Sequence, residues 1–200
     1  MTAAARQPRR TIIDRSLDSA EGYLHLVTGR ASRFGVARRF RNRMARHCVD
    51  TAVQTLRDHR PTMTRSQRIR SHLLIGQGLR VLRRFDSSVK HLWFVAQRDP
   101  ADRDAWLALG WSLKRLGRVA HAASILEMAI RFRPDDAMIL YNLACYQTLL
   151  GEHDAAIENL CAALDRNSDL LIRVPNEADF DGLRHLPQMR AIAHASLVAG

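Results

Sequence analysis

A spacing of 34 residues constrains the fold of this chain more than any other feature. Small residues recur at this step at Gly76, Gly110 and Ala144. The same step relates Ile75 to Leu109 and Leu143, Ser88 to Ala122 and Ala156, Leu92 to Leu126 and Leu160, Val95 to Ala129 and Ala163, and Pro100 to Pro134 and Ser168. A fixed period of this length is typical of repeat architectures. We therefore expect stacked copies of one short structural unit.

Each copy has the pattern of two antiparallel helices. Leu109 and Leu113 supply an apolar stripe at helical spacing, and the small residues Gly110 and Ala122 allow the two helices to approach closely. The predicted fold class is therefore all-α.

Glycine and proline mark the limits of the predicted helices. Gly117 and Gly151 lie where a tight turn needs a residue that tolerates positive φ. Pro100 and Pro134 are expected to end the second helix of a pair, because proline lacks the backbone donor.

These residues resemble the tetratricopeptide repeat, whose pattern is W-x2-L-G-x2-Y, then A-x3-F, then A-x4-P. One matching unit consists of Trp106, Leu109, Gly110, Leu113, Ala122, Leu126, Ala129 and Pro134. The resemblance covers residues 69–170 and departs from the pattern at Ser88, Gln147 and Ser168. It implies a right-handed α-solenoid of stacked antiparallel helix pairs.

The period suggests four segments along the chain. We expect a basic tail at 1–13, a degenerate repeat with an Arg-rich amphipathic helix at 14–62, three repeats at 67–170, and a helical cap at 171–200. The last segment leaves the 34-residue pattern, although Phe180 and Leu183 fit one short helix and Pro187 can open another. A solenoid needs such an element to cover its last apolar face.

Positive charge is concentrated in the first third of the chain. Residues 1–66 hold 14 Arg against 5 acidic residues, a net charge of +9 of the total +11. Much of it belongs to a predicted amphipathic helix at 34–57, whose apolar stripe includes Ala37, Phe40 and Cys48. The opposite face carries Arg38, Arg39, Arg41, Arg43 and Arg46. This face either binds RNA or an anionic membrane surface, or is a solvated face on a helix that packs against the first repeat; we favour the second interpretation.

The resemblance also implies a binding groove, since the first helices of successive repeats line a concave surface in the family. The corresponding positions here are Arg70, Leu73, Gln77, Arg80, Leu107, Trp111, Lys114, Met138, Tyr141 and Asn142. Trp111 and Tyr141 are residue types that often anchor interfaces. For any single position the alternative is packing against a neighbouring helix or beneath the chain's own tail. Only Asn142 matches the pattern with which some family members grip a terminal carboxylate, so the sequence argues against that variant.

No catalytic, cofactor or metal motif is found in the sequence. The adjacent pair His47–Cys48 makes a poor chelate because neighbouring helix residues point in different directions. The paired acids Asp135 and Asp136 are expected at a helix start, where they offset the helix dipole. We therefore expect neither an enzyme nor a cofactor nor a small-molecule substrate.

The sequence lacks an apolar run of the ~18–20 residues that span a bilayer and lacks a secretory h-region. The three cysteines are expected to be reduced thiols. A cytoplasmic protein is therefore expected, with a mitochondrial presequence in the Arg-rich opening as the alternative. The closing segment resembles that of many bacterial tetratricopeptide proteins, which suggests a bacterial source.

These observations lead to one main functional hypothesis and one alternative. The first is a non-enzymatic adaptor that binds a protein or peptide in the concave groove. The alternative is a nucleic-acid-binding module that acts through the Arg-rich helix at 34–57.

Overall fold

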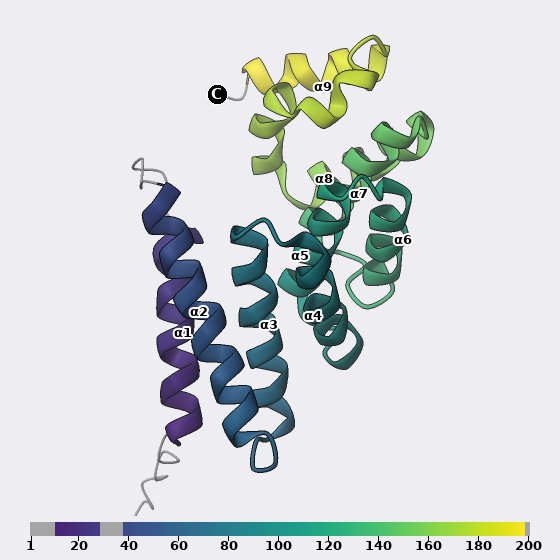
Figure 1. Ribbon diagram of the computed structural model, residues 1–200. Helices are drawn as coiled ribbons and strands as arrows, with labels where there is room; N and C mark the ends of the chain where they lie inside the picture. The colour runs from purple at the N-terminus through teal and green to yellow at the C-terminus, as the bar shows by residue number, and fades with distance from the viewer. Residues whose placement is uncertain (1–10, 29–37, 199–200) are drawn as a thin grey trace, which may run out of the picture. The chain divides into compact units, whose positions relative to one another are not determined.

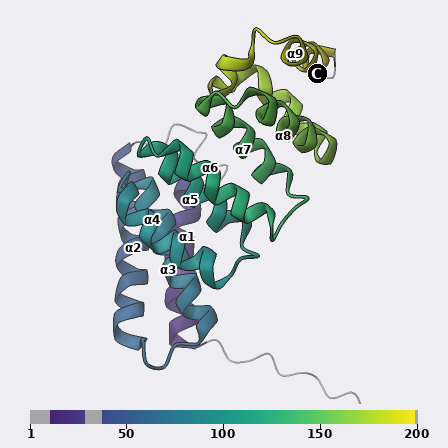
Figure 2. The ribbon, with the colours of Figure 1, turned by 90° about the vertical axis from the view of Figure 1, so that its right-hand side faces the viewer.

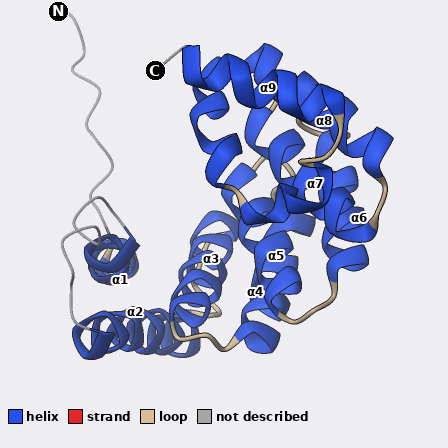
Figure 3. Cartoon of the chain, turned by 90° about the horizontal axis from the view of Figure 1, so that it is seen from above, coloured by secondary structure: helices blue, strands red, loops and turns tan. Residues whose placement is uncertain are grey.

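The described residues of the computed structural model, 11–28 and 38–198, form helices joined by short connections (Figure 1). Within these ranges no strand occurs, and Figure 3 shows only helix and loop. The all-α prediction is confirmed. The helices group into two compact units, Met1–Val95 and Ala96–Gly200.

The first unit contains α1 (Ile12–Thr28), α2 (Arg38–His59), α3 (Arg65–Val81) and most of α4 (Phe85–Arg98). Helix α2 packs against both α1 and α3. The basic tail lies largely outside the described residues, as do positions 34–37 of the predicted Arg-rich helix.

The second unit contains two helix pairs, α5 (Arg103–Arg115) with α6 (Val119–Ile130) and α7 (Ala137–Leu150) with α8 (His153–Arg166). Figure 2 shows α7 and α8 side by side, as their contacts require. Two 3₁₀ helices follow, η2 (Ser168–Asn176) and η3 (Ala178–Leu183), and then α9 (Pro187–Val198). The expected stacking of antiparallel pairs is confirmed.

The core of the second unit consists of the residues that define the repeat. Trp106, Leu109, Leu113 and Leu126 are buried almost completely. The Trp106 indole donates a hydrogen bond from Nε1 to the Pro100 carbonyl oxygen at 2.9 Å, which ties the start of α5 to the preceding turn. Burial of these large apolar surfaces supplies the main favourable free energy for pairing the helices.

Helix starts keep the 34-residue period farther along the chain than the residue pattern does. The second helices begin at Phe85, Val119, His153 and Pro187, each 34 residues after the one before. The expected departure from the pattern thus concerns the helix before α9. There the chain forms η2 and η3 in place of one α-helix, and Pro175 inside η2 cannot donate a backbone hydrogen bond.

Helix α2 is amphipathic as expected, with one difference at its beginning. Ala45, Cys48 and Ala52 are buried, whereas Phe40, which the sequence places on the apolar stripe, is 45% exposed. Phe40 lies in the first turn, before the buried residues begin. The helix buries the rest of its stripe, and its packing against α3 agrees with the favoured interpretation of the sequence.

A half-buried pair of histidines stands in the first unit where the second unit has a buried tryptophan. His72 takes the place that Trp106 has one repeat later, and its Nδ1 lies 3.1 Å from Nδ1 of His91 on α4. The His72 ring also stacks on Phe94, with centroids 3.9 Å apart. One imidazole must donate and the other accept, so this contact requires at least one neutral ring. Burial lowers the pKa of His91 below its unperturbed value of 6.5.

We expect the first unit to lose stability as the pH falls below about 6.5, because the unfolded chain then binds a proton that the folded His91 resists. The thermal midpoint, followed by circular dichroism, should be lower at pH 5.0 than at pH 7.5. His91→Gln should reduce this difference, and His121→Gln, at an exposed position on α6, should leave it unchanged. An equal effect of both substitutions would contradict the assignment to His91.

The turns between paired helices share one backbone conformation. Gly117 and Gly151 have φ values of 74° and 80°, which confirms their predicted role. The equivalent residue of the preceding repeat, 34 residues before Gly117, is Arg83, with a φ of 61°. The left-handed region costs a residue with a Cβ about 1–2 kcal/mol. The first turn is therefore strained where the next two are not.

Arg83→Gly should raise the free energy of unfolding by about 0.5–1 kcal/mol, because relief of strain exceeds the added freedom of glycine in the unfolded chain. Urea denaturation measures this change. Gly117→Ala is the matched control: a Cβ there meets no atom within 4 Å, so its expected loss of about 1 kcal/mol reports the backbone alone. No gain from Arg83→Gly would show that other contacts of Arg83 outweigh the strain.

Candidate functional site

In the first unit, the predicted groove positions lie on α3. Leu73, Gln77 and Arg80 are half-buried, and burial lowers the pKa of the Arg80 guanidinium. Arg70 forms ion pairs with two carboxylates of α1, Asp18 at 2.7 Å and Glu21. The charge of Arg70 is thus already balanced by the neighbouring helix.

In the second unit, the predicted positions on α5 are half-exposed. Leu107 and Trp111 lie one turn apart, and the Arg115 guanidinium carbon is 5.7 Å from the Trp111 ring centroid. This separation allows a cation–π interaction that orients the indole. Helix α5 thus buries Trp106 on its core side and presents Trp111 and Leu107 on another.

On α7, Tyr141 is much more buried than a groove residue needs to be. Only 3% of its surface is exposed, and its ring meets the edge of Phe180 in η3 with centroids 5.4 Å apart. The neighbouring positions Met138 and Asn142 remain half-buried, and Asn142 Nδ2 donates to the Met138 carbonyl oxygen at 2.7 Å. The alternative that a predicted position packs beneath the chain's own tail therefore applies to Tyr141.

Lys114 on α5 also contacts η3. Its Nζ pairs with the Asp179 carboxylate and lies 6.0 Å from the Tyr146 ring centroid. The structure brings Lys114 and Tyr141 together under one short segment, and it leaves Trp111 and Leu107 half-exposed.

The hydroxyl of Tyr141 is buried without a hydrogen-bond partner among the described residues. Burial raises the pKa of Tyr141 well above its usual value, and the nearby carboxylates of Glu177 and Asp179 act in the same direction. An unsatisfied buried hydroxyl costs about 1–3 kcal/mol. The contact between α7 and η3 is therefore well packed around the ring but imperfect at its polar end.

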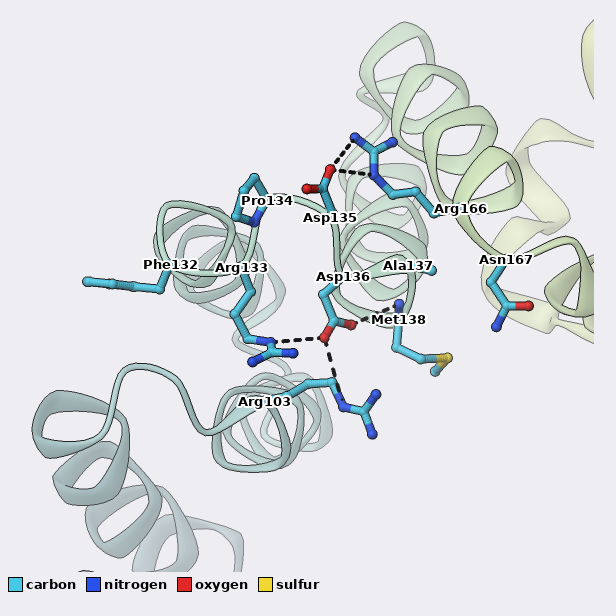
Figure 4. A pocket seen from close by; sticks show the side chains of 10 residues that line it. All are labelled: Arg103, Phe132, Arg133, Pro134, Asp135, Asp136, Ala137, Met138, Arg166 and Asn167. Atoms are coloured by element: carbon cyan, nitrogen blue, oxygen red, sulfur yellow. Dashed lines mark hydrogen bonds and ion pairs between the residues drawn. The ribbon is translucent and has the colours of Figure 1, made fainter.

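A cleft of about 540 Å³ lies where α6 connects to α7 (Figure 4). Its arginines face aspartates: Arg133 Nε is 3.1 Å from Asp136, and Arg166 Nη2 is 3.1 Å from Asp135. Asp136 also accepts hydrogen bonds from the first amides of α7, which confirms the expected placement of these acids at a helix start. The sequence did not predict this cleft, although RFRPDD contains three of its five charged residues. Because each of its three arginines lies within 4.0 Å of an aspartate, the cleft is best explained as a structural connection.

The five arginines predicted for α2 are all exposed, namely Arg38, Arg39, Arg41, Arg43 and Arg46. None of them forms an ion pair with another described residue. A cleft of about 480 Å³ runs along this surface and is lined by Arg39, Asn42, Arg43, Arg46, His47 and Asp50. The surface can attract anions, since most of its charge is uncompensated locally.

Cys48 and Cys145 are buried and Cys161 is exposed, all as free thiols. Burial raises the pKa of Cys48 to about 12, so this thiol stays protonated at neutral pH. Its sequence neighbour His47 packs against Tyr23 with ring centroids 5.4 Å apart. Over residues 11–28 and 38–198, His, Cys, Asp and Glu form no group of three or more that could hold a metal ion. In the same ranges, no helix has the length and apolarity to cross a bilayer.

Comparison with known proteins now identifies the repeats. Two profiles described as tetratricopeptide repeat match residues 103–144 and 138–170. Residues 103–170 are tetratricopeptide repeats. The matches fall on α5 to α8, the two regular helix pairs of the second unit, and confirm the resemblance over these residues.

One curated relative of this chain is Superkiller protein 3 of Schizosaccharomyces pombe, with 29% identity over 91 residues. The match covers 45% of this chain and only 7% of the length of that relative. It therefore relates the repeats of the two proteins and not their complete architectures.

Solved structures of MamA share the fold of this chain. One has a TM-score of 0.66 at 14% identity, with 94% of each chain covered. A second has a TM-score of 0.64 at 14% identity and covers 90% of this chain and 91% of that one. At such low identity the likeness concerns the fold alone.

Tyr141→Phe should leave the fold intact and raise the free energy of unfolding by about 1 kcal/mol, because it removes the buried hydroxyl that has no partner among the described residues. Urea denaturation of the two proteins measures the difference. Tyr23→Phe, at a half-exposed ring on α1, is the control and should change stability by less than about 0.5 kcal/mol. A clear loss of stability in Tyr141→Phe would mean that the hydroxyl is satisfied in solution.

Proposed function

We propose that this chain is a non-enzymatic adaptor that binds a protein or peptide along the first helices of its repeats. Tetratricopeptide repeats form protein-interaction scaffolds, and two regular copies are present here. The observation that carries the proposal is the two-sided character of α5. Trp106, Leu109 and Leu113 are buried in the core, whereas Leu107 and Trp111 remain half-exposed.

Trp111 is the residue best suited to anchor such a partner. A tryptophan gives a large contact area with few rotatable bonds, and it is among the residues that contribute most to interfaces. Arg115 lies against its ring, so the indole is already oriented before a partner arrives. Leu107 extends the same surface by one helical turn.

A bacterial cytoplasmic location remains the expectation that accompanies this proposal.

A second candidate function, nucleic-acid binding through α2, is supported by a separate observation. The exposed arginines of α2 lack ion-pair partners in the described part of the chain, and Arg39, Arg43 and Arg46 line one cleft. These three residues lie at i, i+4 and i+7, so they share one helix face. Arginine binds phosphate oxygens through charge and paired hydrogen bonds.

Substitution of Trp111 tests the adaptor function. Wild-type protein, Trp111→Ala and Phe132→Ala are each used to capture partners from nuclease-treated extract, and the affinity of the captured partner is then measured. Trp111→Ala should weaken binding by more than about 2 kcal/mol, roughly 30-fold. Phe132, a 54% exposed aromatic residue beyond the end of α6, is the matched control and should change affinity little. Equal retention of the partner by both variants would refute the role of this surface.

Charge reversal on α2 separates the second candidate from the first. A fluorescent single-stranded oligonucleotide is titrated with wild-type protein, with Arg39→Glu/Arg43→Glu, and with Arg57→Glu/Arg60→Glu. The two double variants change the net charge equally, but Arg57 and Arg60 lie outside the α2 cleft. If α2 binds nucleic acid, only the first variant should lose affinity by tenfold or more, with a shallower salt dependence. Equal losses in both variants would indicate attraction to net charge without a site.

A further inference from the structure

A short acidic segment of the chain lies on the face that α5 and α7 share. Residues 177–183, with the sequence EADFDGL, place Phe180 between Asp179 and Asp181. We call these residues the acidic–aromatic segment. Most of it forms η3, which packs against α7.

The segment is held mainly through two neighbouring side chains of different chemistry. Phe180 is fully buried and meets Tyr141 edge to face. Next to it, the Asp179 carboxylate pairs with Lys114 Nζ, where the two side chains are only 16% and 25% exposed. A partly buried ion pair is screened less by water and salt than a surface pair. The face therefore recognises an aromatic ring and a carboxylate at a fixed separation.

Other residues of the segment are constrained by close packing. Leu183 is fully buried, and the Cβ position of Gly182 lies 3.4 Å from Thr148 Cγ2 on α7. By contrast, Asp181 is exposed and pairs with the nearby Arg184. The segment thus places an aromatic residue and a small residue against α7, between the paired Asp179 and the buried Leu183.

The segment does not satisfy every group of the face that it covers. The Tyr141 hydroxyl has no hydrogen-bond partner in the described part of the chain, although it lies beside the buried ring of Phe180. The segment is also wound as a 3₁₀ helix, whose hydrogen-bond geometry is poorer than that of an α-helix. A peptide that keeps the ring and the carboxylate and adds an acceptor for this hydroxyl would make every present contact and one more.

From these contacts we infer that the α5–α7 face binds a partner peptide in which an acidic residue precedes an aromatic one, and that residues 177–183 compete internally for this face. This inference rests on the proposed adaptor function and states which chemistry the partner carries. Lys114 selects the carboxylate, Tyr141 selects the ring, and Trp111 on the same helix as Lys114 extends the contact.

A peptide added in trans tests the inference. The probe is a labelled peptide of residues 175–185, and the control peptide carries alanine in place of Asp179 and Phe180. Each is titrated with full-length wild-type protein, with Phe180→Ala, and with Phe180→Ala combined with Lys114→Glu. We expect Phe180→Ala to bind the probe at least tenfold more tightly than the wild type, because its own segment has lost the anchoring ring. The control peptide should not bind, and Lys114→Glu should abolish the gain.

Thermal unfolding provides a second measurement on the same proteins. The probe should raise the melting temperature of Phe180→Ala, whereas the control peptide should not. If Phe180→Ala retains its helical circular dichroism but binds both peptides equally or neither of them, the inference is overturned. If this variant does not fold, Asp179→Ala replaces it, since it keeps the buried ring; a gain of less than threefold over the wild type then overturns the inference.

The outcomes also distinguish this inference from the proposed function, because the peptide titration uses no cellular partner. A probe that does not bind, combined with partner capture that depends on Trp111, overturns the inference alone. A probe that binds as expected, combined with capture that ignores Trp111, overturns the Trp111 surface and leaves the acidic–aromatic recognition intact.

Discussion

Burial of apolar side chains between paired helices is the interaction on which the whole structure depends. A single helix pair cannot shield its own stripe from water, so Trp106, Leu109 and Leu126 become core residues only when α5, α6 and α7 stack. Close approach is possible because small residues stand where the helices meet. At Gly110, an added Cβ would lie 3.3 Å from both Leu126 and Tyr146. The same requirement explains why the helix spacing persists to α9 although the residue columns do not.

A stack of this kind has to end, and its end shapes the candidate site. Beyond α8, the chain forms two 3₁₀ helices and α9, which bury Val174, Phe180, Leu183 and Met189. Helix η2 packs against α8 and η3 packs against α7, the two helices of the last regular pair. One consequence is that Lys114 and Tyr141 contact the chain itself, while Trp111 stays accessible on the neighbouring turn. The part of this face that residues 177–183 cover and the part that they leave half-exposed thus lie on the same two helices. A partner bound at Trp111 would therefore lie beside residues 177–183.

The repeat also shows where its copies tolerate exceptions. Arg83 can take the left-handed conformation at the turn position that glycine has in the next two repeats. The free-energy cost of strain at one residue is small compared with the free energy that the helix pair gains by burying apolar surface. The core column accepts His72 because His91 and Phe94 provide a polar and a stacking partner beside it. Neither exception changes the helix spacing, since that spacing is set by many columns together. Each exception instead makes the stability of one local contact sensitive to sequence or pH.

The sequence by itself determined the helix pairs, their turns at Gly117 and Gly151, the burial of Trp106 and the amphipathic character of α2. It could do so because periodic spacing and backbone preferences act locally along the chain. It could not determine that Phe40 would be exposed or that Tyr141 would be buried, since both depend on where the neighbouring elements end. Nor could it place Asp179 against Lys114, which is 65 residues away in the sequence. Only the tertiary structure decided these contacts, because two residues without a shared period meet only when the packing of everything between them brings them together.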